Sequence, residues 1–152
     1  VEIAEEDDAF TLKKKMDKIV EKNINEIIMG VIKGTIIAIP QEKGGSYYPK
    51  RTYYGRFANF KLMTAEDIHN LTRSQIGHGG LLTTYNFKRI AFHLSKLIKD
   101  SSGKMFGGEV VKINFDEQKG DSVIVQCTRG KVELYSKSRK LRSLSIGDRL
   151  GT

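Results

Sequence analysis

The residues best suited to chemistry in this sequence are cations, and they gather in its second half. Residues 80–152 hold 14 Lys and Arg against 7 Asp and Glu, whereas residues 1–79 hold 12 against 11. The densest run is Ser136-Lys-Ser-Arg-Lys-Leu-Arg142. Such a surplus is typical of a surface that binds anions such as phosphates. A charged surface that only keeps the protein in solution would have the same composition, so both interpretations stay open.

A second group combines aromatic rings with positive charge. Residues 47–54 include four tyrosines around Lys50 and Arg51. Rings interleaved with cations can stack on a base or a sugar while the charges meet phosphate. The same tyrosines could instead fasten a linker to the surface of a domain through their rings.

Residues typical of catalysis or metal binding form no recognisable set. His69, His78 and His93 fall on an expected helix, a loop and a strand, without a second ligand at metal-binding spacing. Cys127 lies among apolar strand residues, which favours a small buried hydrophobic side chain over a nucleophile. As the single cysteine it excludes an internal disulfide and suits a reducing cytoplasm. We therefore expect no catalytic residue and no metal site in this chain.

Helices are expected first along the chain. Apolar residues between 10 and 32 recur at steps of three and four, which predicts an amphipathic helix with Asp8 as its N-cap. A short helix is expected to open at Thr64, where Thr64 and Asp67 fit a capping box, and Arg73 lies on it. No apolar run approaches the length of about 20 residues that a bilayer span needs.

After Gly80 the pattern changes to β-structure. Five strands are expected, at 81–86, 88–98, 108–115, 121–127 and 131–137. Short antiparallel strands without intervening helices favour a small barrel of the oligonucleotide/oligosaccharide-binding (OB) type, with an SH3-like barrel or a sandwich fragment as alternatives. The expected fold is therefore α+β, with a helical N-terminal part and linker followed by a five-stranded OB-like antiparallel β-barrel.

Several segments together resemble the folate-dependent formyltransferases. They are Gln41, SYYPK at 46–50, TAEDIHNLTR at 64–73, GGLLTTYNFKRI at 79–90, GGEVVKI at 107–113, SVIVQCTRGKVEL at 122–134 and IGDRL at 146–150. They are similar to the region that joins the catalytic domain of that family to its C-terminal barrel, above all in the methionyl-tRNA formyltransferases. Asn59-Phe60 and Gly79-Gly80 depart from the Asp-Trp and Pro-Gly that the family usually shows.

This resemblance implies a division of the chain into three parts. Residues 1–40 would end the catalytic domain, 41–63 would form the linker, and 64–152 would form the barrel domain with its leading helix. The family's catalytic residues and folate pocket correspond to sequence ahead of Val1, so the chain alone is expected to be inactive. The complete enzyme would take its formyl group from formyl-tetrahydrofolate, in the cytoplasm. The residues nearest the acceptor would be Tyr47, Tyr48, Lys50 and Arg73.

The resemblance also implies initiator tRNA as a partner, together with the missing catalytic domain. The cations expected to bind the tRNA are Lys88, Arg89, Arg129, Lys131, Lys137, Arg139, Lys140 and Arg142. Two alternatives stay open. One is the same region of a nucleotide-sugar N-formyltransferase, whose acceptor is a nucleotide-linked amino sugar. The other is a stand-alone nucleic-acid-binding barrel.

Overall fold

The structure is a computed structural model that describes residues 1–48, 52–99, 106–116 and 120–151. The chain divides into two compact units, Val1–Arg51 and Thr52–Thr152. The expected linker, 41–63, runs across this boundary. Its second half belongs to the second unit, where the Ala58 amide donates to the Leu82 carbonyl at 2.8 Å and Phe60 is buried.

The first unit is built on one long helix, α1 (Ala9–Ile32). It begins as predicted at Asp8, whose carboxylate accepts the amides of Phe10 and Thr11, both at 2.8 Å. Most of its apolar residues remain open to solvent in the described chain, with Met16 53% and Val31 61% exposed. Neither this helix nor the other described one is long and apolar enough to cross a lipid bilayer.

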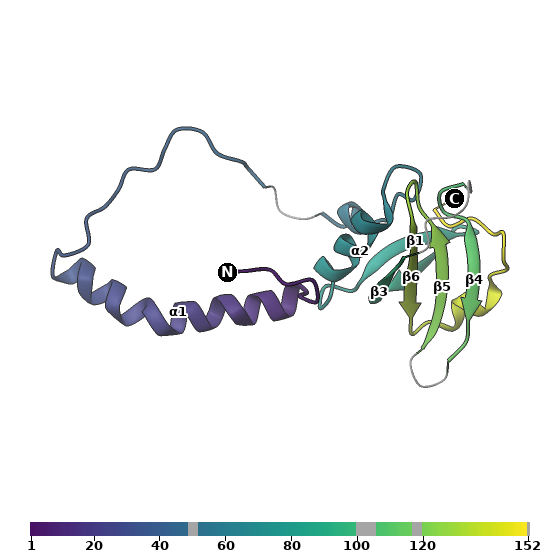
Figure 1. The fold of residues 1–152 in the computed structure, drawn as a ribbon, viewed down its shortest axis with the longest axis horizontal. Helices are drawn as coiled ribbons and strands as arrows, with labels where there is room; N and C mark the ends of the chain where they lie inside the picture. The colour runs from purple at the N-terminus through teal and green to yellow at the C-terminus, as the bar shows by residue number, and fades with distance from the viewer. Residues whose placement is uncertain (49–51, 100–105, 117–119, 152) are drawn as a thin grey trace. The chain divides into compact units, whose positions relative to one another are not determined.

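The second unit combines a short helix with two antiparallel sheets, which confirms the α+β class (Figure 1). The smaller sheet pairs β1 (Leu81–Tyr85) with β2 (Lys88–Phe92). The larger sheet has the order β3 (Leu94–Ile98), β6 (Lys131–Ser136), β5 (Asp121–Gln126), β4 (Val110–Asn114). The helix, α2 (Ala65–Ser74), packs against β3 and β6. The predicted capping box is present, since Thr64 and Asp67 exchange hydrogen bonds of 3.1 and 2.9 Å.

The strand expected at 88–98 is wrong as a single strand, because the chain changes sheet at His93. Before that point the core side chain is Phe92, and after it the buried position is Ser95 rather than Leu94, which is 50% exposed. The inward phase therefore slips by one residue. The His93 amide donates to the Tyr135 carbonyl at 3.1 Å, so the backbone stays beside β6 while it turns. The described residues thus hold six strands instead of five.

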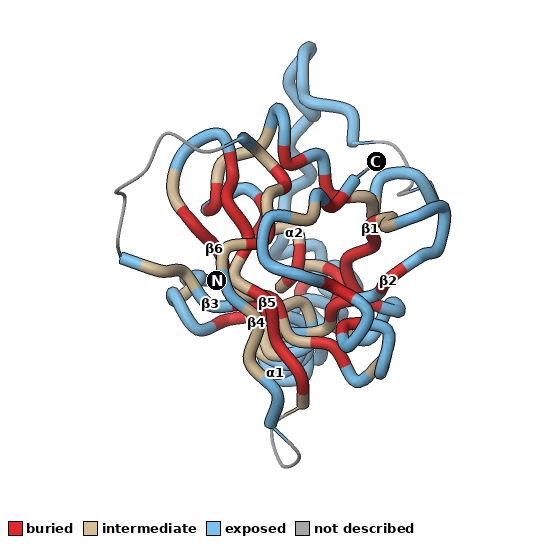
Figure 2. The backbone as a smooth tube through the Cα atoms, turned by 90° about the vertical axis from the view of Figure 1, so that its right-hand side faces the viewer, coloured by how far each residue is buried: buried red, intermediate tan, exposed pale blue. Residues whose placement is uncertain are grey.

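The regular strands form two separate sheets and no closed barrel among the described residues. An irregular C-terminal segment lies between them. The Leu150 amide donates to the Gly108 carbonyl next to β4, and the Gly151 amide donates to the Thr84 carbonyl in β1, both at 2.8 Å. The core beneath includes Ile68, Phe92 and Leu134, all fully buried. Figure 2 shows buried stretches in red along the strands and exposed stretches in pale blue in turns.

Candidate nucleic-acid interface

A short 3₁₀-helix, η2 (Arg139–Ser143), sorts the densest cationic run onto two sides of the second unit. Residues three apart are eclipsed in a 3₁₀-helix. Arg139 and Arg142 therefore share one side, while Lys140 and Ser143 share another. Leu141 is fully buried and anchors the turn in the core. The cations of this run consequently serve two different surfaces.

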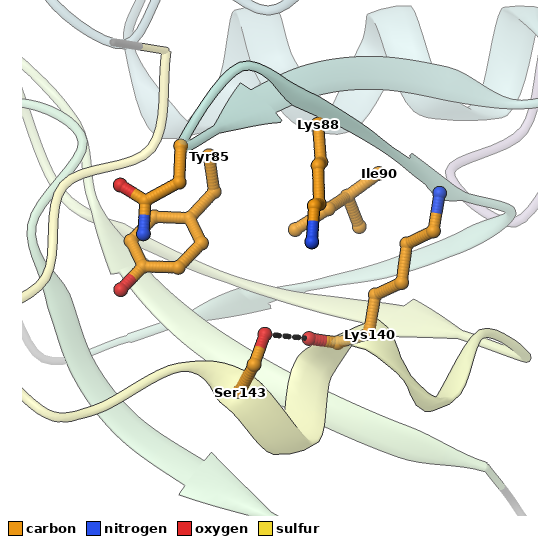
Figure 3. Close-up of a pocket in the computed structure, with 6 residues that line it drawn as sticks. Tyr85, Lys88, Ile90, Lys140 and Ser143 are labelled. Carbon is orange, nitrogen blue, oxygen red and sulfur yellow. Dashed lines mark hydrogen bonds between the residues drawn. The ribbon is translucent and has the colours of Figure 1, made fainter.

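The Lys140 side faces a pocket of about 270 Å³, which we call the hairpin pocket (Figure 3). The described residues that line it are Tyr85, Asn86, Lys88, Ile90, Lys140 and Ser143. Lys88 points from the β1–β2 hairpin toward η2, and Lys140 rises from η2 toward the hairpin. The two lysine side chains thus start from opposite walls of the pocket, and none of the described lining residues is acidic.

The hairpin wall follows from the pairing of β1 with β2. Tyr85 and Lys88 are cross-strand partners on either side of a two-residue turn, so their side chains lie on the same face. Ile90, two residues after Lys88, shares that face and contributes apolar surface. The pKa of Tyr85 is raised, chiefly by its hydrogen bond to Asp148. Asp148 also accepts the Ser145 amide at 2.7 Å, so this carboxylate fixes the tyrosine and the C-terminal segment together.

The η2 wall is fixed by a hydrogen bond to the hairpin. The Lys140 Nζ donates to the backbone carbonyl of Arg89 at 3.0 Å. An ammonium group has three donors, so this contact orients Lys140 and leaves donors for a ligand. The Ser143 hydroxyl donates to the Lys140 carbonyl at 2.8 Å, which stabilises the last turn of η2.

The other side of η2 is electrostatically mixed. Lys137, Arg139 and Arg142 line a second pocket together with Asp116 and Asp121. The Arg142 Nε donates to the Asp121 carboxylate at 3.1 Å. Part of the positive charge on this side is therefore balanced internally, which makes the hairpin pocket the stronger candidate for an anion.

Arg89 lies on the opposite face of the hairpin from Lys88. It donates to the Tyr53 hydroxyl, and its guanidinium carbon stands 5.9 Å from the centre of that ring. Arg56 stands 5.8 Å from the same centre and donates through Nη2 to the Gly80 carbonyl at 3.1 Å. The Tyr53 ring and hydroxyl therefore contact the second unit, in agreement with the interpretation that the tyrosines attach the linker to a domain surface. Tyr54, by contrast, is 82% exposed.

The remaining predicted cations of the barrel do not join the hairpin pocket. Arg129 is exposed in the β5–β6 turn, and its carbonyl accepts the Ala65 amide at the start of α2 at 2.9 Å. Lys131 follows at the start of β6 and is buried. Arg73 donates to the Asn70 side chain within α2 at 2.6 Å.

The acceptor residues expected in the linker belong to the first unit. Tyr47 and Tyr48 are 87% and 86% exposed in an extended segment. Lys50 lies outside the described residues.

Tyr85 and Ser143 were not among the predicted site residues. Tyr85 could have been predicted, because a two-residue turn at Asn86-Phe87 pairs Tyr85 with Lys88 directly. Ser143 depends on η2, whose short 3₁₀ turn leaves no strong periodic signal.

His69 and Cys127, which carry side chains capable of catalysis, contribute to the packing of the second unit. The Nδ1 of His69 lies 2.8 Å from the Oγ of buried Ser95 and ties α2 to β3. Burial raises the pKa of the Cys127 thiol to about 12. Within the described ranges, no group of three or more His, Cys, Asp and Glu is placed to hold a metal ion.

Comparison with family models and with curated proteins identified no relative of this chain. No family model matches the chain, and no curated protein matches it.

Proposed function

We propose that the second unit binds a nucleic acid through its phosphates, with the hairpin pocket as the main contact. One observation carries this proposal. Lys88 and Lys140 lie on opposite walls of one pocket, and none of the described residues that line it is acidic. Two ammonium groups around one site suit a phosphate, whose neutralisation releases counterions and drives binding.

The form of the pocket supports a polymer over a small molecule. A volume of about 270 Å³ lies slightly below the roughly 300–1,000 Å³ of sites that enclose whole ligands. One phosphate with part of its nucleotide fits this size better than a complete nucleotide sugar. η2 also presents Arg139 toward the opposite side, where a longer phosphate chain would continue.

The wider assignment comes from the resemblance to the formyltransferases. We propose that the chain is the acceptor-binding part of an enzyme similar to methionyl-tRNA formyltransferase, and that the nucleic acid is initiator tRNA. In such an enzyme the tRNA-linked amine attacks the formyl carbon of formyl-tetrahydrofolate. No residue of this chain is assigned to that step; its part is to hold and orient the tRNA.

An OB-like barrel belongs to the same proposal. The C-terminal segment hydrogen-bonds to Gly108 beside one sheet and to Thr84 in the other, and this link between the two sheets supports the proposal of a partly open barrel. Barrels of this type commonly bind oligonucleotides.

Fluorescence anisotropy of labelled initiator tRNA over a salt series tests the proposal. Affinity should fall steeply with salt, and the double variant Lys88→Gln/Lys140→Gln should reduce the slope of log K against log[salt] by roughly 1.4 to 1.8. Arg129→Gln is the matched control, an exposed cation outside the pocket, and should leave the slope largely unchanged. Absence of binding at low salt, or equal slopes for the two variants, would contradict the proposal. A free nucleotide sugar that competes as well as tRNA would favour the nucleotide-sugar enzymes instead.

A further inference from the structure

The tip of the β1–β2 hairpin presents an aromatic ring to solvent. The two turn residues, Asn86 and Phe87, have φ angles of 47° and 60°. Positive values at both central positions define the tight turns that suit the twist of paired strands. The Phe87 side chain is 100% exposed, so its ring gains nothing from burial within the described chain.

Phenylalanine is an unfavourable residue for this backbone conformation. Glycine is the usual second residue of such turns, because a Cβ in the left-handed region lies too close to the following carbonyl oxygen. A bulky residue with positive φ is a conformational outlier, and outliers of this kind concentrate at binding sites. A fully exposed ring at such a position points to an external partner for that ring.

The position of Phe87 in the chain indicates the partner's chemistry. Phe87 stands between Asn86 and Lys88, which both line the hairpin pocket, so its backbone lies beside the candidate phosphate site. An aromatic face next to cations is how proteins bind single-stranded nucleic acid, with the base stacked on the ring and the backbone held by charge. In a regular duplex the base faces are already stacked on one another and are not available.

We infer that Phe87 stacks on an unpaired base of the bound nucleic acid, next to the nucleotide whose phosphate lies between Lys88 and Lys140. This inference rests on the proposed function, since it assumes that the pocket holds a nucleic-acid phosphate. It adds that the bound segment is single-stranded: a loop, a bulge or an unpaired end.

The chain contains no tryptophan, so Phe87→Trp creates a single fluorescent reporter at the site. The titrant is an oligouridylate of about eight nucleotides, within the usual footprint of single-strand binding folds. Stacking should quench the Trp emission on binding. A duplex RNA with the same number of phosphates should bind more weakly and should leave the emission nearly unchanged.

Phe87→Leu separates stacking from general apolar contact, because it keeps an exposed apolar side chain and the same backbone conformation. Its affinity for the oligouridylate should fall by about 5- to 150-fold, the range expected for one base–aromatic stack. The salt slope should stay at its original value, whereas Lys88→Gln should reduce it by about 0.7. Phe106→Leu is the control, since Phe106 is also exposed, at 68%, but lies outside the hairpin.

The outcomes distinguish this inference from the proposal beneath it. Three results would overturn the stacking role but not the phosphate site, provided that RNA still binds in a salt-dependent way. They are unquenched Trp emission, full affinity in Phe87→Leu, and equal affinity for duplex and single strand. Failure of the wild-type chain to bind either RNA at low salt would overturn both.

Discussion

Gly80 lies so close to Phe92 that a side chain between them has no room: a Cβ added at Gly80 would stand 2.3 Å from the Phe92 carbonyl oxygen. Gly80 immediately precedes β1, and Phe92 ends β2 opposite Leu81. This close approach closes the base of the hairpin whose tip carries the candidate site. The close packing of Gly80 against Phe92 at the base of the hairpin therefore helps to fix the strand pairing that positions Tyr85 and Lys88 at its tip.

Gly80→Ala should consequently destabilise the second unit strongly. Gly80 has φ +76° and a backbone atom in the way, whereas Gly77 has φ +80° with nothing within 4 Å of the added Cβ. Gly77→Ala should cost only the left-handed penalty of about 1–2 kcal/mol. Gly80→Ala should cost roughly 3 kcal/mol or more, because the backbone must also move. Urea unfolding of both variants measures the difference, and equal free energies of unfolding would show that the close approach is absent in solution.

Phe87→Gly should stabilise the fold while it removes the stacking ring. Glycine adopts the left-handed conformation without strain, which raises the free energy of unfolding. Its greater entropy in the unfolded chain offsets part of this, so the net gain in the free energy of unfolding is roughly 0.5–1 kcal/mol. Phe87→Ala keeps the unfavourable φ and should gain nothing. Chemical denaturation of the three proteins is the measurement. A loss of stability in Phe87→Gly would indicate that the ring packs within the protein.

Cys127 should resist alkylation until the protein unfolds. Burial raises its pKa from the usual 9.0 to about 12, and the thiolate is the reactive form. At about pH 8 the thiolate population alone should slow the reaction with iodoacetamide roughly a thousandfold relative to the unfolded chain. Mass spectrometry of labelling with and without urea tests this expectation. Rapid labelling of the native protein would place the thiol near the surface.

His93 should make stability depend on pH. Burial, followed by the charge of Lys137, lowers its pKa below the usual value of 6.5. The unfolded chain then binds more protons than the native one between the two pKa values, so the free energy of unfolding should fall as the pH drops below about 6.5. His93→Gln should remove this contribution, and Lys137→Gln should reduce it. Urea unfolding at several pH values, with an NMR titration of His93, measures both effects. A slope in His93→Gln identical to that of the wild type would assign the dependence to other groups.

Sequence predicted the local features of the fold and missed those that depend on distant partners. Asp8 and Thr64 cap the helices as expected, because a cap is decided by residues within one turn. The change of sheet at His93 was missed, because apolar residues continue to alternate at Leu94. Contacts with α2 and β6, remote in sequence, make Ser95 the inward residue.

For the candidate site, too, sequence predicted what is local and missed what depends on distant residues. The cationic run 136–142 was evident from composition, which left an anion-binding surface and a solubilising surface as its two interpretations. Which cations share a pocket could not be predicted, because that depends on the 3₁₀ phase of η2 and on the pairing of Tyr85 with Lys88. Neither Lys88 nor Lys140 carries a sequence signal that separates it from Arg129.

The hairpin pocket has one wall from residues 85–90 and the other from residues 140–143, so it vanishes when the chain unfolds. Any compound that occupies it binds only the native form and must raise the midpoint of heat denaturation, by an amount that grows with its concentration. At about one hundred times its dissociation constant, such a compound adds about 2.7 kcal/mol. A melting screen of oligonucleotides and nucleotides can therefore rank candidate ligands without any functional assay.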